Sequence, residues 1–128
     1  MNHAVMPTTI APPAARYAHA VVSTGGARLL HTSGVVPITP DGAVPTDLGE
    51  QAAVVWSNLV AILTEAGMAV TDIVAVTTYV VVGNELGPVM AARDAAFDGH
   101  IAASTLVTVP ALVRPEWQVE VAIVAAAR

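Results

Sequence analysis

The chain contains neither cysteine nor lysine among its 128 residues. Without cysteine it has no disulfide, no thiolate nucleophile and no cysteine-ligated zinc or iron–sulfur site. Without lysine it can form no Schiff base with a carbonyl substrate and no phosphate-binding P-loop. These two absences exclude several large classes of enzyme mechanism before any motif is considered.

Charged residues of both signs are scarce. They make up 12% of the chain, and ten acids against five arginines give a net charge of −5. Binding to nucleic acid requires clustered basic side chains that neutralise phosphates. The arginines stand singly along the chain, so we expect no nucleic-acid partner; they are Arg16, Arg28, Arg93, Arg114 and Arg128.

Long hydrophobic runs are also missing. The longest, Val121–Ala127, has seven residues, whereas a membrane span needs about 20. The first ten residues lack both the positive segment and the apolar core of a signal peptide. The four histidines show no H-x-x-x-H spacing, so we expect no helix-borne metal site. We therefore expect a cytoplasmic protein with no metal and no membrane partner.

Apolar residues, by contrast, make up 55% of the chain. A chain of this length forms one domain and buries roughly two-thirds of its unfolded surface. The charged side chains are too few to cover the remaining surface. We therefore expect part of the apolar surface to lie in an interface between subunits.

Caps and periodicity predict two helices. Asp47 precedes an apolar stripe with spacings of three and four, and Gly67 follows it, which predicts a helix over residues 48–66. Gly87-Pro88 opens a second helix that runs to about residue 97, because proline is tolerated at the first helical position. The stripe of the first helix consists of Leu48, Ala52, Val55, Leu59, Ile62 and Ala66.

Five segments have the composition of strands. Two of them, residues 17–23 and 27–33, flank Thr24-Gly25-Gly26, which predicts a hairpin. The third, residues 73–82, is apolar on both faces, so we expect a helix to cover one face and a neighbouring subunit the other. The last two are residues 105–109 and 117–125. Residues 1–16 carry no periodic pattern and are expected to form an extended arm before a single domain over residues 17–128.

Taken in order, these blocks resemble the RidA/YjgF family over about residues 11–126. They include 17–21 (YAHAV), 31–37 (HTSGVVP), 72–74 (DIV), 93–97 (RDAAF), 103–107 (ASTLV) and 119–121 (VEV). The resemblance implies a chorismate-mutase-like α+β fold of order β-β-α-β-α-β-β. In this fold a mixed sheet carries two helices on one face, and a homotrimer encloses a central barrel.

The resemblance also implies an activity. Archetypal members hydrolyse reactive enamines and imines, such as 2-aminoacrylate, in clefts between subunits, and they use no metal and no organic cofactor. An endoribonuclease label is attached to the family as well. The negative net charge and the absence of lysine disfavour that activity here.

The resemblance places a small-molecule site around Tyr17, Ser33 and Gly34. The hydroxyls of Tyr17 and Ser33 would hold a water molecule or the nitrogen of a substrate. The alternative is that Tyr17 packs at a subunit boundary and Ser33 caps a turn. His31 is expected on the same strand face as Ser33 and is a candidate general base, with a histidine hydrogen-bonded inside the hairpin as the alternative.

Three positions depart from the archetypal pattern. Ser104 stands where the archetypal deaminase has an arginine that clamps the substrate carboxylate. The absence of that arginine should weaken carboxylate binding by about 2–4 kcal/mol. Ala122 replaces the second of two acids in the last strand, so Glu120 remains as a partial substitute. Met90 stands where an asparagine is common. These departures indicate a divergent branch of the family.

Three further residues are candidates for substrate binding. Arg93 is the only basic residue of the second helix, and it either reaches the cleft between subunits or forms a surface ion pair with Asp94, Asp98 or an acid of a neighbouring subunit. Trp117 either walls the pocket or covers the edge of the sheet. Leu106, like Met90, suits an apolar substrate.

Two functions fit these residues. In the first, the protein hydrolyses an enamine or imine other than the small 2-imino acids. In the second, it is a trimer that binds a small molecule without turnover. Retention of Tyr17 and Ser33 favours the first.

Overall fold

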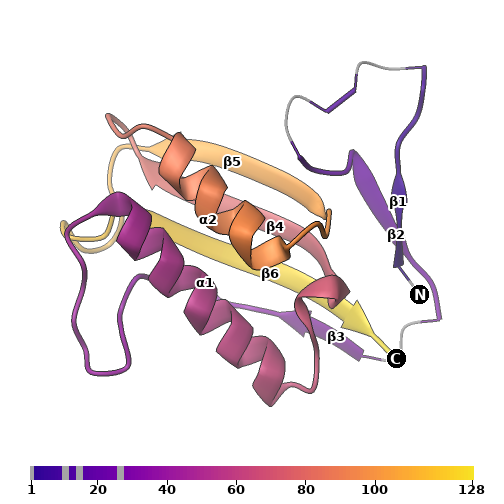
Figure 1. Ribbon diagram of the computed structural model, residues 1–128, viewed down its shortest axis with the longest axis horizontal. Helices are drawn as coiled ribbons and strands as arrows, with labels where there is room; N and C mark the ends of the chain where they lie inside the picture. Colours follow the sequence, from indigo (N-terminus) through magenta and orange to yellow (C-terminus); the bar gives the residue numbers. More distant parts are fainter. Residues whose placement is uncertain (1, 10–11, 14–15, 26–27) are drawn as a thin grey trace.

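A four-stranded mixed sheet with two helices on one face forms the body of the protein in this computed structural model (Figure 1). The structure describes residues 2–9, 12–13, 16–25 and 28–128. The strands are β1 (Asn2–Val5), β2 (Ala20–Ser23), β3 (Arg28–His31), β4 (Ile73–Val81), β5 (Ala103–Val109) and β6 (Val119–Ala127). The helices are α1 (Leu48–Glu65) and α2 (Gly87–Phe97), and a 3-10 turn (Val70–Asp72) precedes β4.

The sheet has the order β3-β6-β4-β5. Strand β4 pairs with β5 in parallel and with β6 antiparallel, and β6 pairs antiparallel with β3. The parallel pair is joined by α2, as a crossover connection requires. The α+β fold expected from the resemblance, with a mixed sheet and both helices on one face, is therefore confirmed.

Both helices begin where the sequence predicts, and the caps of α1 are the predicted ones. The Asp47 carboxylate accepts a hydrogen bond from the Glu50 backbone N–H at 3.0 Å, and Gly67 after α1 has a φ of +69°. One member of the predicted stripe is wrong: Ile62 is 36% exposed, whereas Leu63 is buried. At about 100° per residue, Leu63 lies closer than Ile62 to the direction set by Leu59, so it packs on the sheet instead.

The core lies between the helices and one face of the sheet. Leu59 of α1 packs there with alternate residues of the central strands, such as Val76 of β4 and Ile123 of β6. The rings of Trp56 and Phe97 meet edge to face at 5.2 Å and join α1 to α2. Alternation along each strand therefore divides the sheet into a helix side and an open side.

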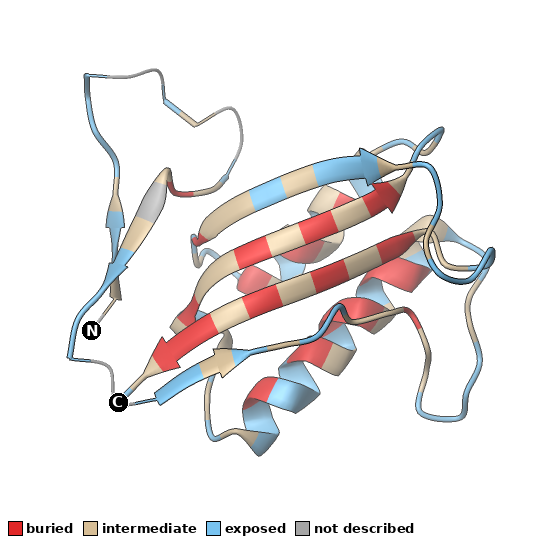
Figure 2. Ribbon diagram, turned by 180° about the vertical axis from the view of Figure 1, so that it is seen from behind, coloured by how far each residue is buried: buried red, intermediate tan, exposed pale blue. Residues whose placement is uncertain are grey.

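The open side carries half-buried residues of the central strands (Figure 2). They include Thr77, Tyr79 and Val81 of β4 and Ala122 and Val124 of β6. The helices cover only the opposite face of β4 within this chain (Figure 1). Cover of the open side by a neighbouring subunit remains a prediction.

The predicted hairpin of residues 17–23 with 27–33 is wrong for the described residues. Strand β2 pairs instead with β1, from Asn2 opposite Ser23 to Val5 opposite Ala20, and β3 pairs with β6. Gly26 and Ala27 lie outside the described residues. The Thr-Gly-Gly turn signal depends only on neighbouring residues, whereas β2 and β3 each pair with a strand that is more distant in the sequence than the expected partner. Part of the predicted extended arm is accordingly the strand β1.

The β1–β2 pair lies beside the sheet near the start of β5 (Figure 1). The backbone N–H of Ala18, which is fully buried, donates to the Ala102 carbonyl at 2.9 Å. The Asn2 side chain donates to the Ala126 carbonyl at 2.8 Å. These contacts carry Tyr17 to the edge of the sheet formed by β5.

In the part of the chain that the structure describes, neither helix has the length and the apolar composition that a membrane crossing requires.

A buried glutamine links α1 to the turn before β6. Gln51 donates to the carbonyls of Pro45 and Glu116 at 2.7 and 2.8 Å and accepts from the backbone N–H of Gln118 at 2.9 Å. Replacement Gln51→Ala removes three hydrogen bonds between a buried side chain and partly buried backbone groups. We expect it to lower the free energy of unfolding by about 3 kcal/mol, because each such group left without its partner costs about 1–3 kcal/mol.

Urea denaturation at fixed protein concentration measures this effect. The matched control is Gln118→Ala, whose partly exposed side chain makes one hydrogen bond, to the Thr46 carbonyl. We expect the control to cost less than about 1 kcal/mol. Equal losses in the two variants would refute the role given to Gln51.

Candidate functional site

Half of the sequence-predicted site residues line one cavity of about 420 Å³ beside β5. They come from three parts of the chain: the segment before β2, the helix α2 and the strand β5. The lining consists of Tyr17, Leu86, Met90, Arg93, Ser104, Thr105 and Leu106. We call it the α2–β5 cavity.

Regular periodicities bring these side chains together. Met90 and Arg93 are three residues apart on α2 and therefore lie on one face of the helix. Ser104 and Leu106 alternate along β5, opposite the buried Val76 and Thr78 of β4, so they point to the helix side of the sheet. The β1–β2 pair adds Tyr17 from a distant part of the sequence.

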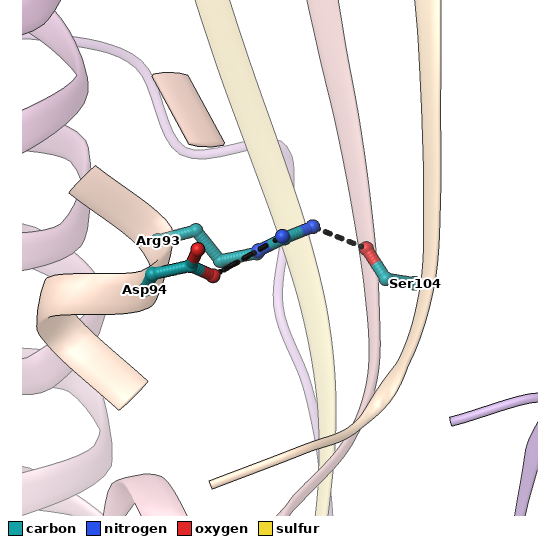
Figure 3. A network of polar contacts seen from close by, with 3 residues as sticks. All are labelled: Arg93, Asp94 and Ser104. Atoms are coloured by element: carbon teal, nitrogen blue, oxygen red, sulfur yellow. Dashed lines mark hydrogen bonds and ion pairs between the residues drawn. The ribbon is translucent and has the colours of Figure 1, made fainter. Parts of the chain in front are cut away.

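Arg93 is the one charged residue among the residues that line the cavity, and its exposure is 5%. Its Nε donates to Asp94 Oδ1 at 3.2 Å, and its Nη1 donates to Ser104 Oγ at 3.3 Å (Figure 3). Its Nη2 lies 3.1 Å from Asp94 Oδ1, but this buried nitrogen makes no hydrogen bond. Arg93 therefore pairs with Asp94, although its own side chain is buried and not at the surface, and it also lines the cavity. Its place in a cleft between subunits stays a prediction.

The cavity has a polar and an apolar part. Arg93 and Ser104 supply donors, and Leu86, Met90 and Leu106 supply apolar walls. Such a pocket suits a small molecule with one polar or anionic end and an apolar body.

A second hollow, of about 430 Å³, lies on the open side of the sheet and contains Glu120. Glu120 stands opposite Tyr79 of β4, and a Cβ added at Gly34 would collide with its carboxylate. The side chain of Glu120 therefore packs directly against Gly34. They lie on the other face of the sheet from Ser104 and Arg93. The hollow is lined by Tyr79, Val109, Ala111, Leu112, Val113 and Glu120.

Four predicted site residues line neither of these cavities: Gly34, which lies against Glu120, and His31, Ser33 and Trp117. His31 ends β3, and Ser33 follows two residues later; both are exposed. Trp117 lies in the turn before β6, with the Arg114 guanidinium carbon 5.3 Å from its ring centroid. Its buried Nε1 has no hydrogen-bond partner. Among the described residues, no group of three or more His, Asp or Glu side chains is placed to hold a metal ion.

The sequence did not indicate Leu86, Thr105 or Tyr79 as lining residues. Leu86 directly precedes the Gly87-Pro88 signal, and Thr105 lies between two predicted residues, so proximity in sequence was the only available clue. Tyr79 was part of a predicted strand, but its opposition to Glu120 depends on the register between β4 and β6.

Comparison with known proteins decides the family. The family model described as Endoribonuclease L-PSP matches residues 8–127. The chain belongs to this family, also known as RidA/YjgF. The matched RidA-like region contains every residue discussed above as a candidate site residue.

Several curated proteins match part of this RidA-like chain. It is 38% identical over 73 residues to the 2-iminobutanoate/2-iminopropanoate deaminase of Escherichia coli K12, a match over 56% of this chain and 57% of the relative. The chain thus spans about half the length of the curated relatives it matches.

Solved structures match over nearly the whole chain. A Rid-family protein of unknown function from Yersinia pestis, YyfB, is 30% identical, with 98% of each chain covered and a TM-score of 0.89. E. coli TdcF with bound serine is 27% identical, with 96% and 94% covered and a TM-score of 0.73.

The close contact between Gly34 and Glu120 leads to a test. Replacement Gly34→Ala forces the Glu120 side chain into another rotamer, because the new Cβ would overlap its carboxylate. We expect a cost of about 0.5–1.5 kcal/mol in the free energy of unfolding. In a Glu120→Ala background the same replacement should cost nothing measurable.

Urea denaturation of the four proteins of this double-mutant cycle measures the coupling. Gly87→Ala serves as the control, since a Cβ there would meet nothing within 4 Å. Additive effects of Gly34→Ala and Glu120→Ala would show that the two residues do not touch in solution.

Proposed function

We propose that the protein is a homotrimer that hydrolyses an enamine or imine of a small metabolite other than the small 2-imino acids. The observation that supports this most is the convergence of Tyr17, Arg93 and Ser104 on the α2–β5 cavity. The deaminase relative and the bound serine in the TdcF structure favour a small amino-acid-like molecule as the substrate class.

The arrangement of the two halves of the site supports the trimer. The α2–β5 cavity lies at the edge strand β5, whereas Ser33 and Gly34 follow the opposite edge strand, β3. In a closed ring of subunits, the β5 edge of one copy approaches the β3 edge of the next. The site would then combine Tyr17, Arg93 and Ser104 of one subunit with the β3 end of its neighbour.

The proposed reaction adds water across the C=N bond of an imine. The water oxygen attacks the imine carbon and one water proton passes to the nitrogen, which gives a carbinolamine. The hydroxyl proton then also moves to the nitrogen, the C–N bond breaks, and ammonia leaves the carbonyl product. An enamine first takes a proton on carbon to become the imine. In this mechanism Tyr17 and Ser33 orient the water and the nitrogen, and Glu120 accepts the proton of the attacking water.

The second candidate function is binding without turnover. One feature favours it: within one chain, Glu120 and Arg93 lie on opposite sides of the sheet. If the neighbouring subunit does not bring a carboxylate to the cavity, the nearest carboxylate is that of Asp94, which is already paired with Arg93, and the cavity binds a ligand without turnover.

The trimer prediction is tested on the open side of the sheet. We expect light scattering during gel filtration to give three times the 13.0 kDa chain mass. Replacement Ala122→Arg places a charge at the middle of the open side, and it should dissociate the trimer because a charge buried in an interface lacks a partner. The control is Ala91→Arg, on the exposed side of α2. A monomeric parent protein, or equal behaviour of both variants, would refute the interface.

The second test concerns substrate choice. An amino-acid oxidase generates imines in situ, and semicarbazide traps what is not hydrolysed. We expect little acceleration for 2-iminobutanoate, because a small ligand relies on its carboxylate anchor and misplacement by about 1 Å can cost 100-fold. The bulkier imine derived from leucine should be hydrolysed faster, because Leu86, Met90 and Leu106 can contact its side chain.

A double variant tests whether the position of the cation causes the low rate with 2-iminobutanoate. A Ser104→Arg change alone sets a second guanidinium against Arg93, whereas Arg93→Gln combined with Ser104→Arg moves the single cation from the helix to the strand. The double variant should raise the rate with 2-iminobutanoate. Equal rates of the parent protein with both imines would overturn the proposed specificity, and no acceleration of either would favour the binding protein.

A further inference from the structure

Arg93 has binding capacity that the protein itself does not use. A guanidinium carries five N–H donors. Two hydrogen bonds, to Asp94 and Ser104, account for Nε and one proton of Nη1, and the buried Nη2 makes none. A buried donor without a partner is costly. Since Arg93 lines the α2–β5 cavity, the missing acceptor is best supplied by a ligand in it.

We propose that Arg93, which reaches the α2–β5 cavity from α2, is the cation that binds the carboxylate of the ligand, and that Asp94 restricts this binding to singly charged carboxylates. The inference rests on the proposed function and adds to it the cation that binds the ligand and the residue that selects its charge.

The charge preference follows from the pairing of Arg93. Asp94 holds one edge of the guanidinium through Oδ1, and its side chain is 34% exposed. Together the two side chains are formally neutral, so one carboxylate makes the local charge −1. A dianion would bring a second negative charge close to Asp94, which repulsion disfavours. Leu86, Met90 and Leu106 provide the contacts for an apolar substituent.

Ser104 acts as a positioning residue. Its Oγ accepts from Nη1 of Arg93 at 3.3 Å and so holds the guanidinium toward β5 (Figure 3). An accepting hydroxyl keeps its own proton, which is available to an oxygen of the ligand. The serine thus supports a cation that comes from the facing helix.

Calorimetry with stable 2-oxo acids tests the inference without any turnover. The probes are 4-methyl-2-oxopentanoate, its neutral amide and the dianion 2-oxoglutarate. We expect the monoanion to bind at least about 10-fold more tightly than the amide or the dianion, the range that a charge-assisted hydrogen bond supplies. Equal affinities for the acid and its amide would overturn the inference.

Three variants divide the roles. Arg93→Met should weaken binding of the monoanion at least about 30-fold, the effect of losing a charged donor. Asp94→Asn should improve binding of 2-oxoglutarate at least about 10-fold relative to the monoanion. Ser104→Ala should weaken binding of the monoanion several-fold, and Ser104→Thr should restore that affinity. The matched control is Arg114→Met, which removes an exposed arginine near Trp117 and should leave all affinities unchanged.

The outcomes separate this inference from the proposed function. Circular dichroism and the oligomer mass establish that each variant folds, and the comparison of acid with amide uses only the parent protein. Retained affinity in Arg93→Met, or an unchanged charge preference in Asp94→Asn, would overturn the inference. Carboxylate binding without imine hydrolysis would contradict only the proposed function. Hydrolysis at equal rates for charged and neutral imines would contradict only the carboxylate site.

Discussion

The register of the central strand β4 with its two partners is the constraint on which the rest of the structure depends. Val76 of β4 packs on the helices, and its partner across the parallel ladder is Ser104. Tyr79 points to the open side, and its partner across the antiparallel ladder is Glu120. Because side chains alternate along a strand, a slip of one residue would exchange the two faces. The burial of β4 under α1 and α2 therefore fixes both halves of the candidate site.

The strand register also places the cation and the carboxylate of the candidate site on opposite sides of the sheet within one subunit. The cation and its serine lie on the helix side near the β5 edge, whereas Glu120 and Gly34 lie on the open side toward the β3 edge. A single chain thus has a binding cavity with little acid–base chemistry beside it. An assembly of subunits edge to edge is the simplest way in which one ligand can meet both halves.

Arg93 is the cation that lies beside Ser104, the position where the resemblance implies an arginine. Ser104 cannot provide the charged fork that the resemblance leads one to expect on β5. Arg93 reaches the same strand from α2 and makes a hydrogen bond with that serine. A cation held from the helix approaches the cavity from another direction, and Asp94 already occupies one of its edges. The cation of this cavity is therefore carried by α2 and not by β5.

The sequence by itself determined both helices and their caps, the strands of the body and the family, because these depend on local periodicity, capping residues and ordered motifs. It also indicated Tyr17, Arg93 and Ser104 as candidate site residues, which the structure brings to one cavity, although it left open what Arg93 contacts. Only the tertiary structure decided that β2 pairs with β1, that Leu63 replaces Ile62 in the core, and that Glu120 and Arg93 lie on opposite faces. These features depend on strand register and on partners far apart in the chain, which no local pattern of residues specifies.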